Sequence, residues 1–114
     1  MALLDGLFAA VFRGKEDQIV RRLAGEVARQ CRAALRNRVS RRSHGMSPAM
    51  LRGYIRAYAA ALVAAEAAAA VTECGANVHL RSRVIDAATE QLVRVVCRDL
   101  LSARFAAQGR AAAA

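Results

Sequence analysis

Large side chains are scarce in this chain of 114 residues. It has no tryptophan, aromatic residues make up 4% of it, and almost half of its apolar residues are alanine. Burying an alanine gains far less free energy than burying a leucine, because the gain follows the apolar area removed from water. A monomer of this composition would have a thin core. We therefore expect either very close helix–helix contact, which alanine permits, or a homodimer that pools the apolar faces of two copies, and we favour the homodimer.

The sequence has little proline and no strand pattern. Pro48 is the only proline, and no segment shows the persistent two-residue alternation of a half-buried strand. The sequence therefore predicts an all-α fold, a single helical domain over residues 1–114. We expect a small bundle of three long helices plus a short amino-terminal helix, assembled as an antiparallel homodimer.

Local signals set the boundaries of these helices. Ser47 followed by Pro48 predicts a helix start, because serine caps a first turn and proline suits the first helical position. Gly75 is a suitable stop for that helix, and Gly14 for the first one. The predicted segments are a short amphipathic helix within 1–14, a helix over 16–39, a connector over 40–47, a helix over 48–74, a loop over 75–80, a helix over 82–106 and a frayed tail over 107–114.

Cysteine usage and hydropathy favour a cytoplasmic protein. The three cysteines, Cys31, Cys74 and Cys97, form an odd set with apolar neighbours, which indicates reduced, buried thiols instead of a disulfide framework. The amino terminus lacks the positive charge of a signal peptide, and Asp5 interrupts its apolar start. The most apolar stretch, 57–71, is short, mostly alanine and contains a glutamate, so we expect no transmembrane span.

Positive charge dominates the polar residues. The chain has 18 basic and 9 acidic residues, a formal net charge of +9 and a pI near 11.2, and all but one of the basic residues are arginine. Such a balance suits a polyanionic partner: nucleic acid, an anionic membrane surface or an acidic protein. The plainer interpretation is that the charge only keeps the protein soluble.

Five arginines share one side of the predicted helix over 16–39. At 100° per residue they fall within an arc of about 100°, opposite the apolar residues. Glu26 is the only acidic residue among them, so salt bridges within the helix do not account for the set. We call the five residues the arginine strip: Arg21, Arg22, Arg29, Arg32 and Arg36.

Guanidinium groups bind phosphate oxygens, so the strip predicts binding to the phosphate backbone of nucleic acid. We expect Arg38, Arg41 and Arg42 to extend that surface. The alternative is a non-enzymatic helical adaptor that binds an acidic protein or an anionic membrane surface through the same strip. A third possibility is a solvated face whose arginine stems cover apolar surface.

Two further segments fit either function. Tyr54 and Tyr58, next to Arg52 and Arg56, could stack on unpaired bases, although packing at the edge of the core is the commoner role of such tyrosines. The sequence Met-Ala-Leu-Leu-Asp at residues 1–5, followed by Leu7, Phe8 and Phe12, resembles the start of MinE-type division regulators. That resemblance, which covers about a dozen residues, implies a segment that docks on a membrane; the alternative is a helix that covers the core or a dimer interface.

Catalytic and metal-binding patterns are lacking. Cys74 and His79 have no second closely spaced ligand pair of the kind that structural zinc sites show, so we expect neither metal nor cofactor. No nucleophile elbow or phosphate-binding glycine loop is present, and we expect no enzyme activity. Asp99 falls within the apolar face of the last helix. Because a buried carboxylate needs a partner, we predict an arginine from another helix or from a second copy.

Overall fold

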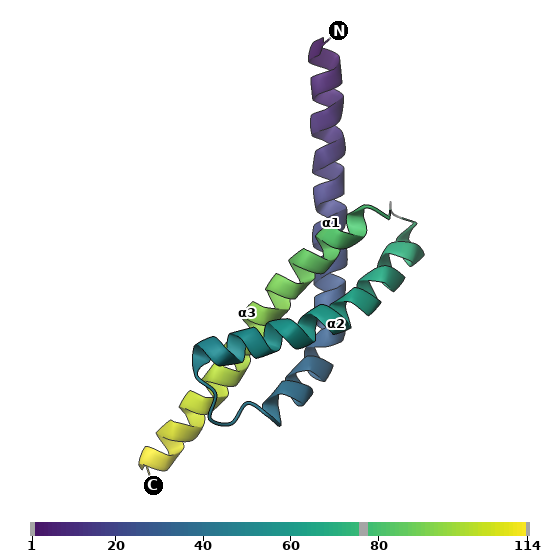
Figure 1. Ribbon diagram of the computed structural model, residues 1–114. Coiled ribbons are helices and arrows are strands. Elements are labelled where there is room, and N and C mark those ends of the chain that lie inside the picture. The colour runs from purple at the N-terminus through teal and green to yellow at the C-terminus, as the bar shows by residue number, and fades with distance from the viewer. Residues whose placement is uncertain (1, 76–77, 114) are drawn as a thin grey trace.

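The protein is a bundle of long helices. The computed structural model describes the backbone of residues 2–75 and 78–113 and the side chains of residues 14–75 and 78–111. Within these residues it has three helices and no strand: α1 (Ala2–Ser40), α2 (Pro48–Cys74) and α3 (Leu80–Ala113). Successive helices run in opposite directions, and each contacts both of the others (Figure 1). The predicted all-α bundle of three long helices is confirmed.

The separate amino-terminal helix that we predicted is not supported. α1 is a single helix of 39 residues that continues through Gly14. A glycine inside a helix costs about 1 kcal/mol relative to alanine, so a single glycine does not by itself end a helix. The side chains of residues 1–13 lie outside the described residues, and so does the predicted contact of this segment with a core, a dimer interface or a membrane.

The ends of α2 are those that the sequence predicts. The Ser47 side chain accepts a hydrogen bond from the backbone N–H of Met50 at 3.2 Å, and Pro48 occupies the first turn. At the other end Gly75 adopts a left-handed conformation with φ of 67°, which a residue with a Cβ rarely adopts. α3 begins at Leu80 and continues through residues 107–113, beyond the predicted range of 82–106. The alanine-rich end favours helix because alanine has the highest helix propensity.

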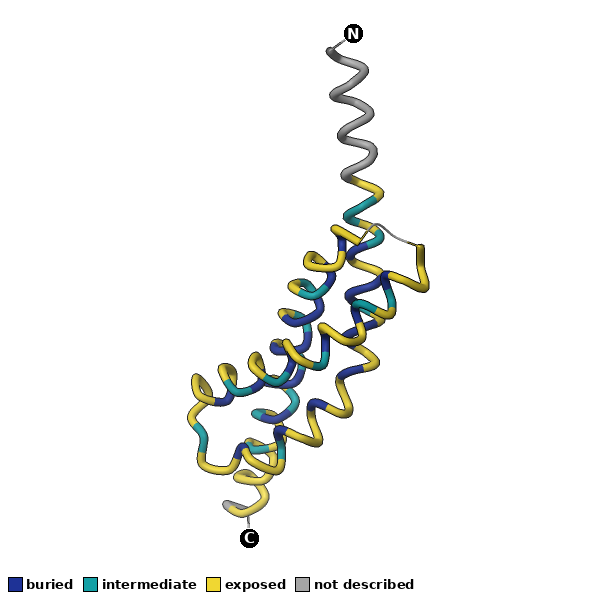
Figure 2. Tube along the Cα trace, turned by 45° about the vertical axis from the view of Figure 1, so that its right-hand side comes forward, coloured by how far each residue is buried: buried dark blue, intermediate teal, exposed yellow. Residues whose placement is uncertain are grey.

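The core follows one apolar stripe on each helix. The buried residues of α2 recur every four residues, and those of α3 follow a similar spacing (Figure 2). Three fully buried alanines, Ala59, Ala67 and Ala88, lie in these stripes, and their small side chains let the helix backbones approach closely. The buried apolar residues are Val20, Leu23, Ala24, Val27, Ala28, Cys31, Leu35 and Val39 in α1, Leu51, Ile55, Ala59, Val63, Ala67 and Val71 in α2, and Leu80, Val84, Ala88, Leu92, Val93, Val96, Cys97 and Leu100 in α3.

The three cysteines differ in their surroundings. All are free; Cys31 and Cys97 are buried, but Cys74 is exposed, so the prediction of three buried thiols is wrong for Cys74. Cys74 is the last residue of α2 and lies beyond Val71, the last buried residue of that helix. Burial raises the pKa of the Cys31 thiol, and the charge of Glu66 adds to the effect.

α2 also has the length and the apolar composition of a membrane-crossing helix. It is the only helix within the described residues for which this holds. A core helix of a soluble protein passes the same test, and α2 contributes a buried stripe to this bundle. The composition of α2 is therefore weak support for a membrane span.

An arginine of α3 holds the connector between α1 and α2. Arg104 donates hydrogen bonds to the backbone carbonyl of Met46, at 2.8 Å, and to that of Ser43. Ser43 is buried, and Gly45 turns the chain with φ of 82°. Hydrogen bonds from a charged donor are stronger than neutral ones, so Arg104 fixes the loop that carries Arg41 and Arg42.

Candidate nucleic-acid interface

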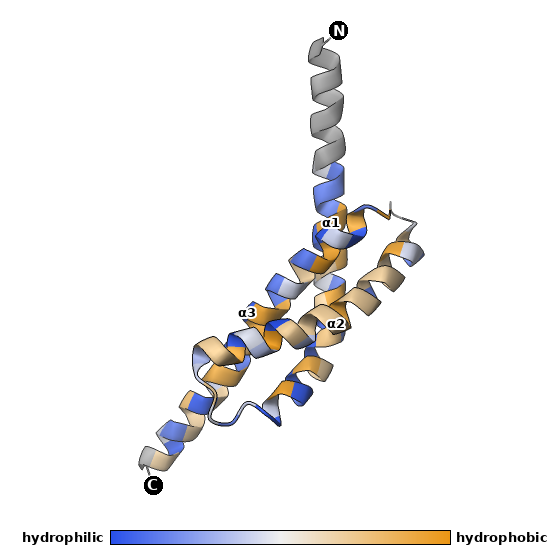
Figure 3. Ribbon diagram, viewed as in Figure 1, coloured by the Kyte–Doolittle hydropathy of each residue, from blue (hydrophilic) through white to orange (hydrophobic). Residues whose placement is uncertain are grey.

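The arginine strip lies on the outer side of α1. All five of its residues are exposed, whereas Val27 on the opposite side of the helix is completely buried. Arg22, Arg29 and Arg36 follow one another at intervals of seven residues, which is about 10.5 Å along the helix axis and brings each within about 20° of the last. Polar residues gather on α1 and α3, whereas α2 is mostly apolar (Figure 3). The strip is therefore a row of charge about 21 Å long.

Arg32 is the member of the strip that is already paired. Its Nη2 donates to Oδ2 of Asp99 in α3 at 2.7 Å, and its Nε donates to the same oxygen at 3.2 Å. The Asp99 side chain is only 14% exposed, as its place in an apolar face predicts. Its salt bridge with Arg32 of α1 confirms the predicted arginine partner from another helix. The hydrogen bond from Arg32 lowers the pKa of Asp99, and the charges of Arg32, Arg36 and Arg98 add to this, against an opposing effect of burial.

Replacing Asp99 with asparagine is expected to lower the free energy of unfolding by about 1 kcal/mol at pH 7, since half-exposed Arg32 limits the strength of the pair. Because the pKa of Asp99 is lower in the folded state, its charge stabilises the fold above the ordinary carboxyl pKa of about 4. This stabilisation disappears as the pH falls through the lowered value. Urea unfolding should therefore give different free energies of unfolding for the wild type and the variant at pH 7 but not at pH 2. An equal difference at the two pH values would contradict an ionic role for Asp99.

The remaining arginines of the predicted site have no carboxylate within salt-bridge distance among the described side chains: Arg21, Arg22, Arg29, Arg36, Arg38, Arg41 and Arg42. Among the described arginines outside the predicted site, two pair with carboxylates. Arg56 pairs with Glu90, and Arg83 pairs with Asp17 and, at 3.7 Å, with Glu16. Most of the predicted site is thus available for an anion, as are five arginines elsewhere that also have no carboxylate within salt-bridge distance among the described side chains: Arg52, Arg81, Arg94, Arg98 and Arg110.

Glutamates border the strip on its α2 side. An open hollow of about 440 Å³ between α1 and α2 is lined by Glu26, Glu66 and Glu73, with Arg22 and Cys74 at its edge. Arg22 Nη2 lies 3.2 Å from the Cys74 sulfur. Carboxylates repel phosphates, so an anionic ligand of the strip is favoured on the α3 side.

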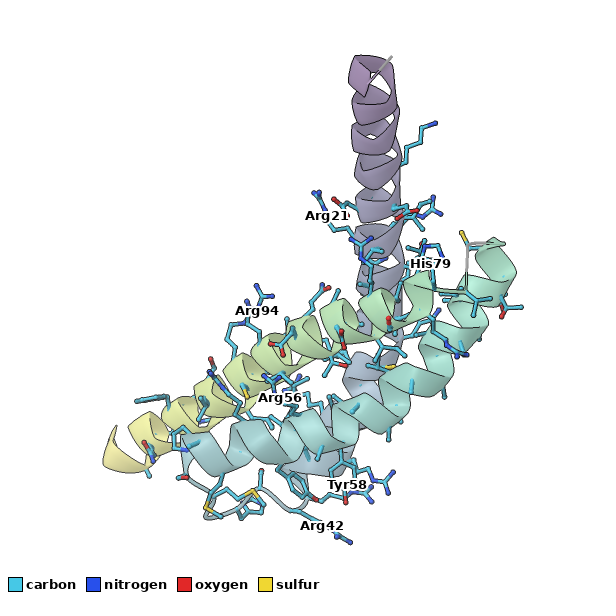
Figure 4. All side chains as sticks on the ribbon, turned by 45° about the horizontal axis from the view of Figure 1, so that its top comes forward. Arg21, Arg42, Arg56, Tyr58, His79 and Arg94 are labelled. Atoms are coloured by element: carbon cyan, nitrogen blue, oxygen red, sulfur yellow. The ribbon has the colours of Figure 1, made fainter. Side chains whose placement is uncertain are left out.

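Arg38, Arg41 and Arg42 do not continue the strip. Arg38 is two residues after Arg36, which is about 200° around the helix, so it lies on the other side of α1. There its guanidinium carbon lies 4.9 Å from the centre of the Tyr58 ring. The three arginines line an open hollow of about 390 Å³, the tyrosine hollow, which consists of Ala34, Asn37, Arg38, Arg41, Arg42 and Tyr58. Figure 4 shows Arg42 and Tyr58 at one end of the bundle, away from Arg21.

The two tyrosines pack at the edge of the core, as the commoner of the two alternatives predicts. Tyr54 and Tyr58 are half-buried against it, with ring centres 4.8 Å apart and ring planes inclined by 53°. Tyr58 nevertheless also lines the tyrosine hollow. The tyrosine pair thus has a structural role and one accessible member.

A basic groove between α2 and α3 was missed in the sequence analysis. It has a volume of about 440 Å³, and its four arginines are Arg52, Arg56, Arg94 and Arg98. Glu90 also lines it and pairs with Arg56. The spacing of Arg94 and Arg98, four residues apart on one helix face, was the available signal.

The described residues contain no group of three or more histidine, cysteine, aspartate or glutamate side chains that could hold a metal ion. Comparison with known proteins finds no family model, curated protein or solved structure that matches this chain. The case for its function therefore depends on the geometry and charge of the arginine surfaces described above.

Proposed function

We propose that this protein is a small, non-enzymatic, cytoplasmic nucleic-acid-binding protein that holds the phosphate backbone through the arginine strip. The observation that supports the proposal most is the row of Arg22, Arg29 and Arg36, which is exposed and has no carboxylate in salt-bridge distance within the described side chains. A row about 21 Å long matches about six base-pair steps of 3.4 Å. Backbone contact of this kind carries no sequence preference of its own.

Binding to a labelled duplex over a salt series tests the proposal. If the five residues of the strip each neutralise a phosphate, the logarithm of the affinity falls with the logarithm of salt concentration with a slope of about −4 to −5. Arg32, which is paired with Asp99, would contribute least. Anionic lipid vesicles form the second arm, because the adaptor alternative predicts binding there. Vesicle binding without duplex binding would overturn the proposal.

We also propose that the protein is a homodimer whose second copy packs on α2. The outer side of α2 carries exposed alanines and no charge between Arg56 and Glu66: Ala57, Ala60, Ala61, Ala64 and Ala65. Such a surface permits close approach of a second helix and would supplement a core of small residues. Light scattering is the test, since a dimer has about twice the chain mass of 12.2 kDa.

A further inference from the structure

The tyrosine hollow combines an aromatic ring, positive charge and an amide at one place on the surface. Tyr58 forms one wall, Asn37 and Arg38 come from the last turns of α1, and Arg41 and Arg42 come from the connector. All of the lining residues except Tyr58 come from the continuous stretch 34–42, and the packing of α2 against α1 brings Tyr58 to it. Tyr54, the other tyrosine of the chain, packs against Tyr58.

The aromatic wall is already arranged for stacking. Arg38 lies over the Tyr58 ring at 4.9 Å, a cation–π contact that holds the guanidinium group against the ring. Tyr54 supports Tyr58 from within the bundle. Unpaired bases stack on aromatic side chains and on the planes of arginine guanidinium groups, so the Arg38 guanidinium, held against the Tyr58 ring, offers a platform for a base.

The charge at the rim is suited to phosphate. Arg41 and Arg42 are exposed and have no carboxylate in salt-bridge distance among the described side chains, and the hold of Arg104 on Ser43 and Met46 limits the freedom of their loop. The positive potential is also felt by Tyr58: the Tyr54 hydroxyl lowers the pKa of Tyr58, and the charges of Arg42 and Arg38 lower it further.

We infer that the tyrosine hollow binds one nucleotide of a single-stranded nucleic acid, an inference that depends on the proposed function. The base stacks on the Arg38–Tyr58 pair, Asn37 bonds to its edge, and Arg41 and Arg42 bind the adjoining phosphates. A volume of about 390 Å³ is within the usual range of small-ligand sites. A base within a duplex is stacked and paired and cannot enter, so the hollow gives the protein a preference for single strands over duplexes.

The preference is tested by binding a labelled single strand and a duplex of equal length to the wild type and to a Tyr58→Leu variant. The variant should lose about 5- to 150-fold in affinity for the single strand, the range that loss of one stacked base produces. Its affinity for the duplex should stay within about twofold, because the strip is untouched. A Tyr58→Phe variant retains the ring and should bind the single strand like the wild type.

A second variant changes only surface charge, so that loss of binding can be distinguished from loss of folding. Arg41→Gln with Arg42→Gln alters only exposed side chains and should weaken single-strand binding more than Arg81→Gln with Arg110→Gln, which removes the same charge at the two ends of α3. Equal losses in the two pairs would contradict a site in the hollow. An unchanged single-strand affinity in Tyr58→Leu would overturn this inference and leave the proposed function intact. Failure of the wild type to bind either nucleic acid would overturn both.

A direct observation of the ring completes the test. A Tyr54→Phe variant retains one tyrosine, so its ring resonances in an NMR spectrum belong to Tyr58. Addition of a single strand should shift them strongly through the ring current of the stacked base, and addition of the duplex should shift them little. Resonances that do not move at a saturating single-strand concentration would rule out stacking in the hollow.

Discussion

A variant with glutamine at positions 22, 29 and 36 is expected to bind duplex nucleic acid roughly 100-fold more weakly than the wild type at 0.15 M salt. Each lost phosphate contact reduces the salt slope by about 0.9, so three losses reduce it by about 2.7 and leave a slope near −2. Glutamine has a polar side-chain amide and a high helix propensity, so the helix itself should be unaffected. Arg32 is left unchanged because its pair with Asp99 contributes to the fold.

The control for this variant removes the same charge elsewhere. Replacing Lys15, Arg81 and Arg110 with glutamine also lowers the formal net charge from +9 to +6, and all three residues are exposed and lie outside the described hollows. Affinity that falls by the same factor in both variants would show that net charge, and not the strip, determines binding. An affinity that survives the loss of Arg22, Arg29 and Arg36 would refute the proposed interface.

The sequence predicted those parts of the fold that depend on neighbouring residues. Both ends of α2 were predicted to the residue. The signals there, the Ser47 cap, Pro48 and the left-handed Gly75, each act within one helical turn. Glycine also commonly ends helices, and Gly14 was predicted to end the first one, but α1 continues through it. A single glycine is a small unfavourable contribution, and residues on both sides decide whether the helix ends there.

The candidate site was predicted as a helix face and not as a set of contacts. Periodicity placed the strip opposite the core correctly, and the position of Asp99 in an apolar face correctly demanded an arginine. Periodicity does not say which residue of another helix lies opposite, so the choice of Arg32 needed the structure. The separation of Arg38 from the strip was already implied by its angle around α1, whereas nothing local marked Arg104 as the residue that holds the connector.

The largest effect on stability is expected from Leu35→Ala. Leu35 is completely buried and, with Leu51, Ile55 and Leu92, is one of the largest buried side chains in the described part of the chain. Truncating a buried leucine costs about 2–5 kcal/mol, through the lost transfer free energy and the cavity that remains. That is a large share of the 5–15 kcal/mol typical of a folded domain, and the alanines of this core have no freedom to fill the gap.

Phe105→Ala is the matched control for this prediction, since Phe105 is larger than leucine but is 74% exposed. Its loss should change the free energy of unfolding by less than about 0.5 kcal/mol, as is usual for surface positions. Urea unfolding followed by circular dichroism measures both variants, and equal midpoints would contradict the described core.

The same unfolding experiment also tests the proposed homodimer, because the unfolding midpoint of a homodimer rises with protein concentration whereas that of a monomer does not. A Leu35→Ala variant whose midpoint stays independent of concentration would argue that this small core stabilises the chain without a second copy.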